Sequence, residues 1–328
     1  FGKSWPIFFR SFGDYKLPVY IYSSIIPIKI FGLNVFAVRL ASALSGALTT
    51  FLIYLLTKKM FPNKGNCFAL FAGLIWAISP WSVLFSRAAF EAPLALLFFL
   101  AAFYLQLIAF EKKKIIILGF SILFYAVSVY TYHTERFLAP LFVFLSLLIY
   151  LKKEKYSLKS VKFVIIGLGL FLLLIFPQYF LFPEFAGQAR INNLSILREG
   201  NFSNLPKRFL ALYSAYFSPR NLFFEPESDL QRSLPELSVF YPWMIIFYFW
   251  GIATLIKEKT CFNKKIIILL LLISPLPAAL TSDPFSSLRA FPLIFPLTII
   301  ISLGLDEFKK LIGKNFLGIT FLIVLLIS

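Results

Sequence analysis

Residues 80–100, PWSVLFSRAAFEAPLALLFFL, join two long apolar runs at a seam that carries Arg87 and Glu91. The run before the seam, 67–79, is almost wholly apolar, and the run after it, 92–110, contains no charged residue. Ionisable side chains at membrane depth are costly and usually lie on a substrate path. The seam therefore predicts a hairpin of membrane helices, with Glu91 as the carboxylate of an active site on the outer face.

The whole chain has the composition of a polytopic membrane protein. Of its 328 residues, 59% are hydrophobic and 14% are charged, which excludes a soluble domain. The net charge of +17 would suit a nucleic-acid partner, but the accumulation of basic residues in cytoplasmic loops explains the charge better, and no nucleic acid is expected. Neither of the two cysteines has metal-ligand spacing and there is one histidine, so no Cys/His metal site is expected.

Apolar runs predict an all-α polytopic membrane protein with about ten transmembrane helices, preceded by a polar loop and an interfacial helix at 17–31. One long outer loop, 183–238, contains an amphipathic helix pattern at 207–217. We expect 1–328 to be a single membrane domain, truncated at both ends, because the chain begins at Phe1 and its last apolar run is short for a span. The predicted spans are 35–56, 67–85, 92–110, 115–130, 137–151, 163–182, 239–256, 266–280, 291–305 and 316–328.

Charged residues divide unevenly between the two alternating sets of loops. One set contains eighteen lysines, five acids and no arginine, whereas the other contains all ten arginines, four lysines and ten acids. Short lysine-rich loops are typically cytoplasmic, so the arginines are expected on the outer face. Arginine binds phosphate or carboxylate through a planar fork of donors, and the outer face is therefore predicted to recognise anions. The alternative is that the outer arginines pair with the ten acids there.

Five stretches of the chain resemble polyprenyl-phosphate-sugar-dependent glycosyltransferases of the GT-C superfamily. These enzymes include glycosyltransferase family 39, the protein O-mannosyltransferases and the aminoarabinose transferases of lipid A. The stretches occur in the order and spacing of the family, and the resemblance extends over nearly the whole chain. They are FFRSFGDYKLPVYIY (8–22), FGLNVFAVRLASALSGALTTFLIYLL (31–56), SPWSVLFSRAAFEAPLALLFF (79–99), YTYHTERFLAPL (130–141) and DPFSSLRAFPLIFPL (283–297).

The resemblance implies transfer of a sugar, with inversion, from a dolichyl or undecaprenyl phosphate to an acceptor protein or glycolipid. The reaction would take place at the outer face of a multi-pass protein of the cell membrane. The family's general base lies in the first outer loop, and this chain begins too late to include it, so we expect the fragment to be inactive. No cofactor is assigned, although a divalent cation bridging the phosphate and a carboxylate stays open.

Two residues of the first stretch match the acid-Lys-Pro pattern of the family. The resemblance implies that Lys16 holds the carrier phosphate and that Asp14 orients Lys16 or contacts the acceptor. Glu91 matches the family's second outer acid, which implies a base or orienting group for the acceptor hydroxyl, and we group it with Asp14 as catalytic. The simpler alternatives are that Lys16 reaches toward lipid headgroups and that Glu91 pairs with Arg87, four residues away.

The remaining candidates are polar residues of the outer loops. Because His133 is the only histidine, a structural role for it is the alternative to a ligand role. We expect several of these side chains to face one cavity near the outer boundary, namely Lys16, Arg87, Glu91, His133 and Arg289. The candidate phosphate ligands are Lys16, Arg87, Arg136 and Arg289, and the candidate sugar or acceptor contacts are His133, Tyr15, Asp283 and Arg232.

A transporter or flippase of a lipid-linked sugar is the second hypothesis, because it would also need outer arginines and a polar cavity. Transporters favour inverted repeats and charges at the midplane of broken helices. Here the charges cluster toward one face, which favours the enzyme. A non-catalytic scaffold is the third hypothesis, and it leaves the segregation of arginine unexplained.

Overall fold

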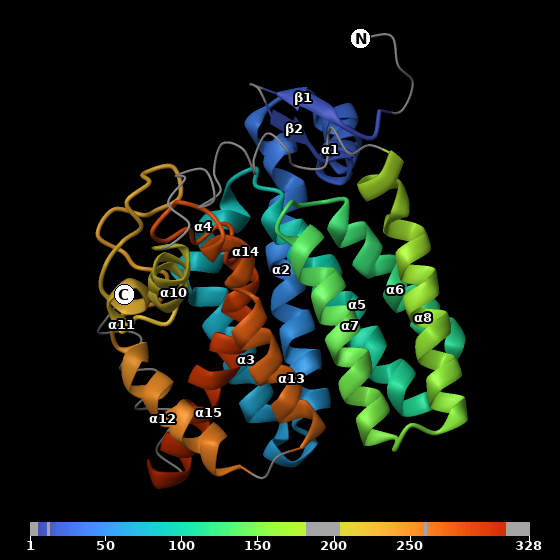
Figure 1. The fold of residues 1–328 in the computed structure, drawn as a ribbon. Helices are drawn as coiled ribbons and strands as arrows, with labels where there is room; N and C mark the ends of the chain where they lie inside the picture. The colour runs from blue at the N-terminus through green and yellow to red at the C-terminus, as the bar shows by residue number, and fades with distance from the viewer. Residues whose placement is uncertain (1–5, 12–13, 182–203, 259–260, 313–328) are drawn as a thin grey trace.

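Helices account for most of the chain, and the long ones run roughly side by side in one bundle (Figure 1). The computed structural model describes residues 6–11, 14–181, 204–258 and 261–312. An antiparallel hairpin of β1 (Phe9–Ser11) and β2 (Asp14–Lys16) stands where the sequence predicts a loop. The helical elements are α1 (Pro18–Phe31), α2 (Val35–Met60), η1 (Pro62–Lys64), α3 (Gly65–Ile78), α4 (Pro80–Arg87), α5 (Ala92–Lys112), α6 (Ile115–Val129), α7 (Glu135–Lys153), α8 (Leu158–Phe176), η2 (Pro177–Leu181), α10 (Leu205–Ala215), α11 (Pro219–Phe223), α12 (Met244–Lys257), α13 (Phe262–Ile273), α14 (Leu276–Ala279), η6 (Phe291–Leu293) and α15 (Ile294–Ile312).

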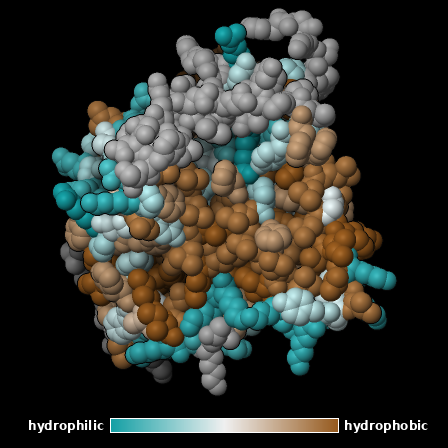
Figure 2. Space-filling view, viewed as in Figure 1, coloured by the Kyte–Doolittle hydropathy of each residue, from teal (hydrophilic) through white to brown (hydrophobic). Residues whose placement is uncertain are grey.

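The described helices make the chain a membrane protein, although the expected ten spans are not confirmed. Figure 2 shows a broad hydrophobic band across the molecule, with hydrophilic side chains above and below it. The helices α6 and α12 are apolar but have 15 and 14 residues, or about 21–23 Å against the ~30 Å of a hydrocarbon core. The span expected at 316–328 lies outside the described residues. Within the described part of the chain, five helices are long and apolar enough to cross a membrane, or six if the bent pair of α3 and α4 counts as one span. The five are Val35–Met60, Ala92–Lys112, Leu158–Phe180, Phe262–Ala279 and Phe291–Leu311.

The bent pair corrects the continuous span expected at 67–85. α3 ends at Ile78 and α4 begins at Pro80, with a bend of 55° between them. A proline has no N–H for the helical ladder and disfavours helical backbone at the residue before it, and Ser79 is accordingly extended. The Ser79 hydroxyl donates to the Val239 carbonyl over 2.9 Å. The break therefore redirects α4, and with it Arg87, away from the axis of α3.

The charged side chains are sorted to two ends of the bundle. We call the end with η1, the α5–α6 and α7–α8 turns and the C-terminus of α12 the lysine end, and the opposite end, with the hairpin, α4 and α10, the arginine end. The ion pairs of the described residues join members of the same end, which supports the predicted alternation of the helices. Pairs at the lysine end are Lys59–Glu111, Lys64–Glu258, Lys113–Glu154 and Lys310–Glu307.

The crossing of α12 and α15 is the tightest helix contact that the glycines reveal. A Cβ on Gly251 would overlap the carbonyl oxygen of Ile300, and a Cβ on Gly304 would overlap that of Phe247. Glycine at both positions lets the two backbones approach as small residues do in membrane helix pairs. Almost all of α15 is buried, so this helix forms the centre of the bundle and carries the preceding loop, 281–290, at the arginine end.

Replacing Gly304 tests this crossing. Gly304→Ala should destabilise the fold by about 1–3 kcal/mol, because the new methyl group meets backbone that cannot rotate away. Thermal unfolding in detergent measures the change. The control is Gly169→Ala in α8, where a Cβ meets nothing within 4 Å and alanine should be neutral or stabilising by up to about 1 kcal/mol. Equal melting temperatures for the two variants would contradict the close crossing.

Candidate functional site

Lys16 is held at the arginine end by the hairpin and the first helix. It closes β2, opposite Phe9 of β1. The next residue, Leu17, is buried, and Pro18 begins α1 with the preset backbone that the first turn of a helix favours. Further along α1, the Tyr20 hydroxyl donates to the Val38 carbonyl of α2 over 3.0 Å. These contacts fix the backbone from which the Lys16 ammonium projects.

The structure brings Lys16 and Glu91 together. The Lys16 Nζ lies 3.3 Å from the Glu91 Oε1, and their side chains are 39% and 18% exposed. Glu91 stands directly before α5, and its carbonyl accepts from the Ala95 N–H over 3.0 Å. Arg87 is exposed and forms no ion pair with a described side chain, so the alternative of an Arg87–Glu91 pair is wrong. An ammonium group and a carboxylate from distant parts of the sequence thus lie next to each other at a place that solvent can reach.

Tyr20 is a neighbour of this pair that the sequence analysis does not predict as a site residue. Burial, together with the charge of Glu91, raises the pKa of Tyr20 to about 12. Its phenol therefore stays protonated at neutral pH and donates to backbone. The one sequence signal is its place in the motif at 8–22, where it stands among apolar residues.

The turn between α6 and α7 contacts both the hairpin and the last loop of this end. His133 Nε2 is 2.9 Å from the Tyr15 carbonyl oxygen, and the Thr134 hydroxyl donates to the Arg289 carbonyl over 3.2 Å. Arg136 is buried, with its guanidinium 5.8 Å from the centre of the Phe8 ring. The backbone contact of His133 favours the structural alternative for this residue. The side chain of Asp14 lies outside what the structure describes.

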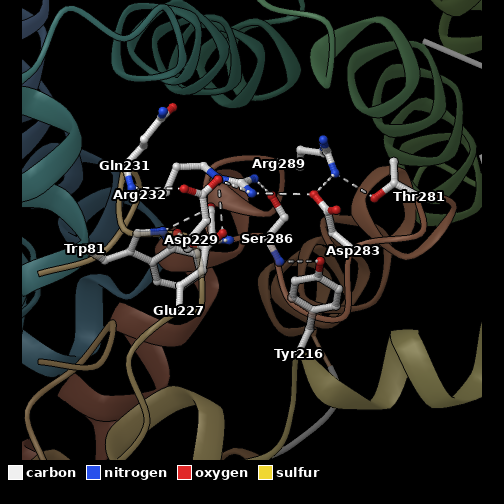
Figure 3. Close-up of polar contacts among 11 residues, drawn as sticks. Trp81, Tyr216, Glu227, Asp229, Gln231, Arg232, Thr281, Asp283, Ser286 and Arg289 are labelled. Atoms are coloured by element: carbon white, nitrogen blue, oxygen red, sulfur yellow. Dashed lines mark hydrogen bonds and ion pairs between the residues drawn. The ribbon is translucent and has the colours of Figure 1, made fainter. Parts of the chain in front are cut away.

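Arg232 and Arg289 converge on one carboxylate. In Figure 3 the two guanidinium groups approach Asp283 from different sides. Arg289 Nη1 lies 2.5 Å from Asp283 Oδ2 and donates to the Thr281 hydroxyl over 2.9 Å. Arg232 Nη2 lies 3.5 Å from the same Asp283 oxygen. Both arginines therefore pair with an acidic side chain. For these two residues this is the alternative to anion binding that the sequence left open.

Glu227 anchors the loop after α11 to the same region (Figure 3). Its side chain is 1% exposed and lies 3.3 Å from Arg232 Nε. The Ser287 N–H donates to it over 3.1 Å, and the Ser287 hydroxyl also donates to it. Burial raises the pKa of Glu227, and the Ser287 donors and Arg232 oppose that rise. A buried charge is costly unless it is paired and hydrogen-bonded, and Arg232 and Ser287 provide both for Glu227.

Ser286 and Ser287 form the point to which this loop is attached. The Ser286 N–H donates to the Tyr216 hydroxyl over 3.0 Å, and its own hydroxyl accepts from Arg232 over 2.6 Å. The Trp81 indole of α4 donates to the Ser287 carbonyl over 3.1 Å. A cavity of about 20 Å³ beside Trp81 and Glu227 has room for one water molecule. The cavity expected to collect Lys16, Glu91 and the other outer candidates stays a prediction.

The charge balance separates these two clusters chemically. Three carboxylates, Glu227, Asp229 and Asp283, surround the two guanidinium groups of Arg232 and Arg289. This cluster therefore has no excess positive charge with which to bind a phosphate. The other cluster does have accessible cations, because Lys16 is 39% exposed and Arg87 forms no ion pair with a described side chain. Among the described residues no group of three His, Cys, Asp or Glu side chains is placed to hold a metal ion.

Removing Arg232 tests the anchor. Arg232→Met removes the guanidinium partner of the buried Glu227 and should lower the free energy of unfolding by about 3–5 kcal/mol. Faster proteolysis of the 224–238 loop measures the loss. The control is Arg220→Met, because the Arg220–Glu225 pair is 75% and 44% exposed and is worth about 0–1 kcal/mol.

The same variant has a defined pH dependence. A carboxyl group whose folded pKa is raised contributes most stability below its ordinary pKa and loses that contribution as pH rises. The free-energy cost of Arg232→Met should therefore be larger at pH 8 than at pH 5, because a lower pH favours the neutral form of the Glu227 carboxyl. A cost that does not change with pH would exclude Glu227 as the group left unpaired.

Solved structures of similar fold match nearly the whole chain. The crystal structure of apo ArnT from Cupriavidus metallidurans matches 94% of this chain and 52% of its own, with a TM-score of 0.58 and 15% identity. The apo Archaeoglobus fulgidus oligosaccharyltransferase matches 98% of this chain and 45% of its own, with a TM-score of 0.60 and 12% identity. The chain thus spans about half the length of these structures, and they establish the fold alone.

Two further structures of the same proteins carry ligands. The C. metallidurans ArnT bound to undecaprenyl phosphate has a TM-score of 0.56 and 15% identity, and the match covers 97% of this chain and 56% of that chain. The A. fulgidus AglB in complex with an inhibitory peptide and a dolichol-phosphate has a TM-score of 0.56 and 11% identity, and the match covers 94% of this chain and 46% of that chain.

No curated protein matches the chain at a significant level. The family model of dolichyl-phosphate-mannose-protein mannosyltransferases matches residues 16–180, which is half of the chain. The chain therefore belongs to the dolichyl-phosphate-mannose-protein mannosyltransferase family, within the GT-C superfamily of glycosyltransferases.

Proposed function

We propose that the protein is a membrane glycosyltransferase that moves a sugar from a polyprenyl-phosphate donor to an acceptor protein or glycolipid. The observation that carries the proposal is the ion pair of Lys16 and Glu91 at the arginine end. Membership of the mannosyltransferase family supports it. The structural neighbours add support, because ArnT is bound to undecaprenyl phosphate and AglB is in complex with dolichol-phosphate in their solved structures.

In the proposed reaction, Lys16 and Glu91 separate when the donor arrives. The ammonium of Lys16 pairs with the donor phosphate, which frees the carboxylate of Glu91 to accept the proton of the acceptor hydroxyl. The acceptor oxygen then forms a bond to the anomeric carbon while the bond from that carbon to the phosphate oxygen breaks. The polyprenyl phosphate leaves with the bonding electrons, and the single displacement inverts the anomeric centre.

The other candidates divide between the two sides of this reaction. Arg87 is exposed and forms no ion pair with a described side chain, so we assign it to the donor phosphate beside Lys16. Arg232 and Arg289 are engaged by Asp283, and we assign them to orienting the loops on the acceptor side. This changes the role predicted for Arg289, because a guanidinium bound to a carboxylate is a poor phosphate ligand unless that pair opens.

The charge segregation supports an orientation in the cell membrane. Short loops rich in lysine tend to stay in the cytoplasm, so the lysine end is proposed to be cytoplasmic. The pair of Lys16 and Glu91 would then lie on the non-cytoplasmic face. The carrier lipid could reach Lys16 from the bilayer, because α1 beside it exposes a row of large apolar side chains, Ile25, Ile26, Ile30 and Phe31.

A flippase of a lipid-linked sugar is the second candidate, and one observation favours it. The break between α3 and α4 gives a discontinuous helix, a feature that transporters use at their binding sites. The paired charges near one end of the bundle favour the enzyme instead.

Two substitutions in the full-length protein test the proposal. Glu91→Gln should lower kcat by about 10²–10⁴-fold, as expected for loss of a general base, whereas Lys16→Ala should mainly raise KM for the donor. Transfer of radiolabelled sugar from a panel of polyprenyl-phosphate sugars measures both. The control is Lys29→Ala, an exposed lysine of α1, which should leave transfer unchanged.

Wild-type rates in both variants would exclude the assigned site. Movement of the labelled lipid across the membrane without transfer would identify the flippase.

A further inference from the structure

A second polar pocket lies at the opposite end of the bundle from Lys16 and Glu91. Its volume is about 320 Å³, large enough for the polar group of a lipid or a small molecule. Its lining comes from η1, from α12 and the C-terminal half of α15, and from Glu258 just after α12, at the lysine end. The lining residues are Lys64, Trp250, Thr254, Lys257, Glu258 and Glu307.

The charges of this pocket are balanced and partly fixed. Lys64 Nζ lies 2.9 Å from Glu258 Oε1 and 3.7 Å from Glu307 Oε1. From outside the lining, Lys310 Nζ lies 2.6 Å from the same Glu307 oxygen. Lys257, by contrast, is exposed and forms no ion pair with a described side chain. The lining therefore contains two ammonium and two carboxylate groups, of which the Lys257 ammonium is available to a ligand.

The surface that leads to the pocket is apolar. Ile246, Phe249, Ala253 and Ile256 of α12 are exposed and recur at spacings of three and four residues, so they form one stripe along the helix. In a membrane protein such a stripe faces acyl chains. Trp250, which lines the pocket, belongs to the residue type that gathers at headgroup level. The stripe therefore runs along acyl chains and ends at a polar pocket at headgroup depth.

We infer that this pocket binds the phosphoethanolamine headgroup of a phospholipid in the leaflet at the lysine end, with its acyl chains along α12. The headgroup phosphate pairs with Lys257, and its primary ammonium donates to the carboxylates of Glu258 and Glu307. A zwitterionic ligand matches a lining of balanced charge. An anionic phosphatidylglycerol headgroup would meet two carboxylates without an ammonium to offer them, and a choline headgroup has no N–H to donate.

Lipid binding to the purified chain in detergent tests the inference without any assay of sugar transfer. The delipidated protein is titrated with phosphatidylethanolamine, phosphatidylglycerol or phosphatidylcholine of matched acyl chains, and bound lipid is counted by native mass spectrometry. Phosphatidylethanolamine should bind most tightly. Lys257→Ala should weaken its binding about fivefold, the effect of one lysine near a lipid phosphate, and Glu258→Gln should reduce its preference over phosphatidylglycerol.

The control is Lys265→Ala, an exposed lysine of α13 at the same end that does not line the pocket. It should leave phosphatidylethanolamine binding unchanged. Three results would each overturn the inference: unchanged binding in Lys257→Ala, an equal loss in Lys265→Ala, or tighter binding of phosphatidylglycerol than of phosphatidylethanolamine by the parent protein. Since Lys257 is exposed, its replacement should not prevent folding, and a matching melting temperature checks this.

Discussion

The cost of placing a charge in hydrocarbon is the constraint on which the rest of the structure depends. It keeps the middle of the bundle apolar and sorts the charged groups to two ends, where they pair with partners of the same end. Inside the band, some neutral polar side chains bond to one another across helices. Gln106, for example, donates to the Ser146 hydroxyl over 3.0 Å and accepts from the Tyr125 hydroxyl over 3.0 Å, which ties α5, α6 and α7 together.

The arginine end contains two kinds of charge cluster with different uses. Around Asp283 and Glu227, arginines are neutralised by buried or shared carboxylates, so these contacts stabilise loops. The pair of Lys16 and Glu91 is more exposed and has fewer partners, so an incoming anion can replace the carboxylate at modest cost. A site that must bind and release a charged lipid requires the second kind, and the first kind supplies the rigid surroundings.

Much of the fold could be predicted from hydropathy, and part of the site from the seam at Arg87 and Glu91. Hydropathy does not report the direction of a helix axis, so it predicts one continuous span at 67–85 and does not predict the bend at Ser79 and Pro80. Hydropathy does not report helix length either, because α6, with 15 residues, is as apolar as the longer helices. The contact of Glu227 with Ser287 joins residues 60 positions apart, and no local pattern in one sequence reveals such a partner. Lys16 and Glu91 were both singled out, but their pairing with each other was not.

The turn between α6 and α7 touches the donor-side hairpin through His133 and the acceptor-side loop through Thr134. Two adjacent residues of one short turn therefore couple both halves of the proposed reaction centre mechanically. A displacement of the hairpin as the lipid carrier docks would be transmitted within a single peptide unit to the backbone of Arg289. In the proposed reaction, docking of the donor at the hairpin would in this way prepare the loop of Arg289 for the acceptor, so that the two would bind in a fixed order.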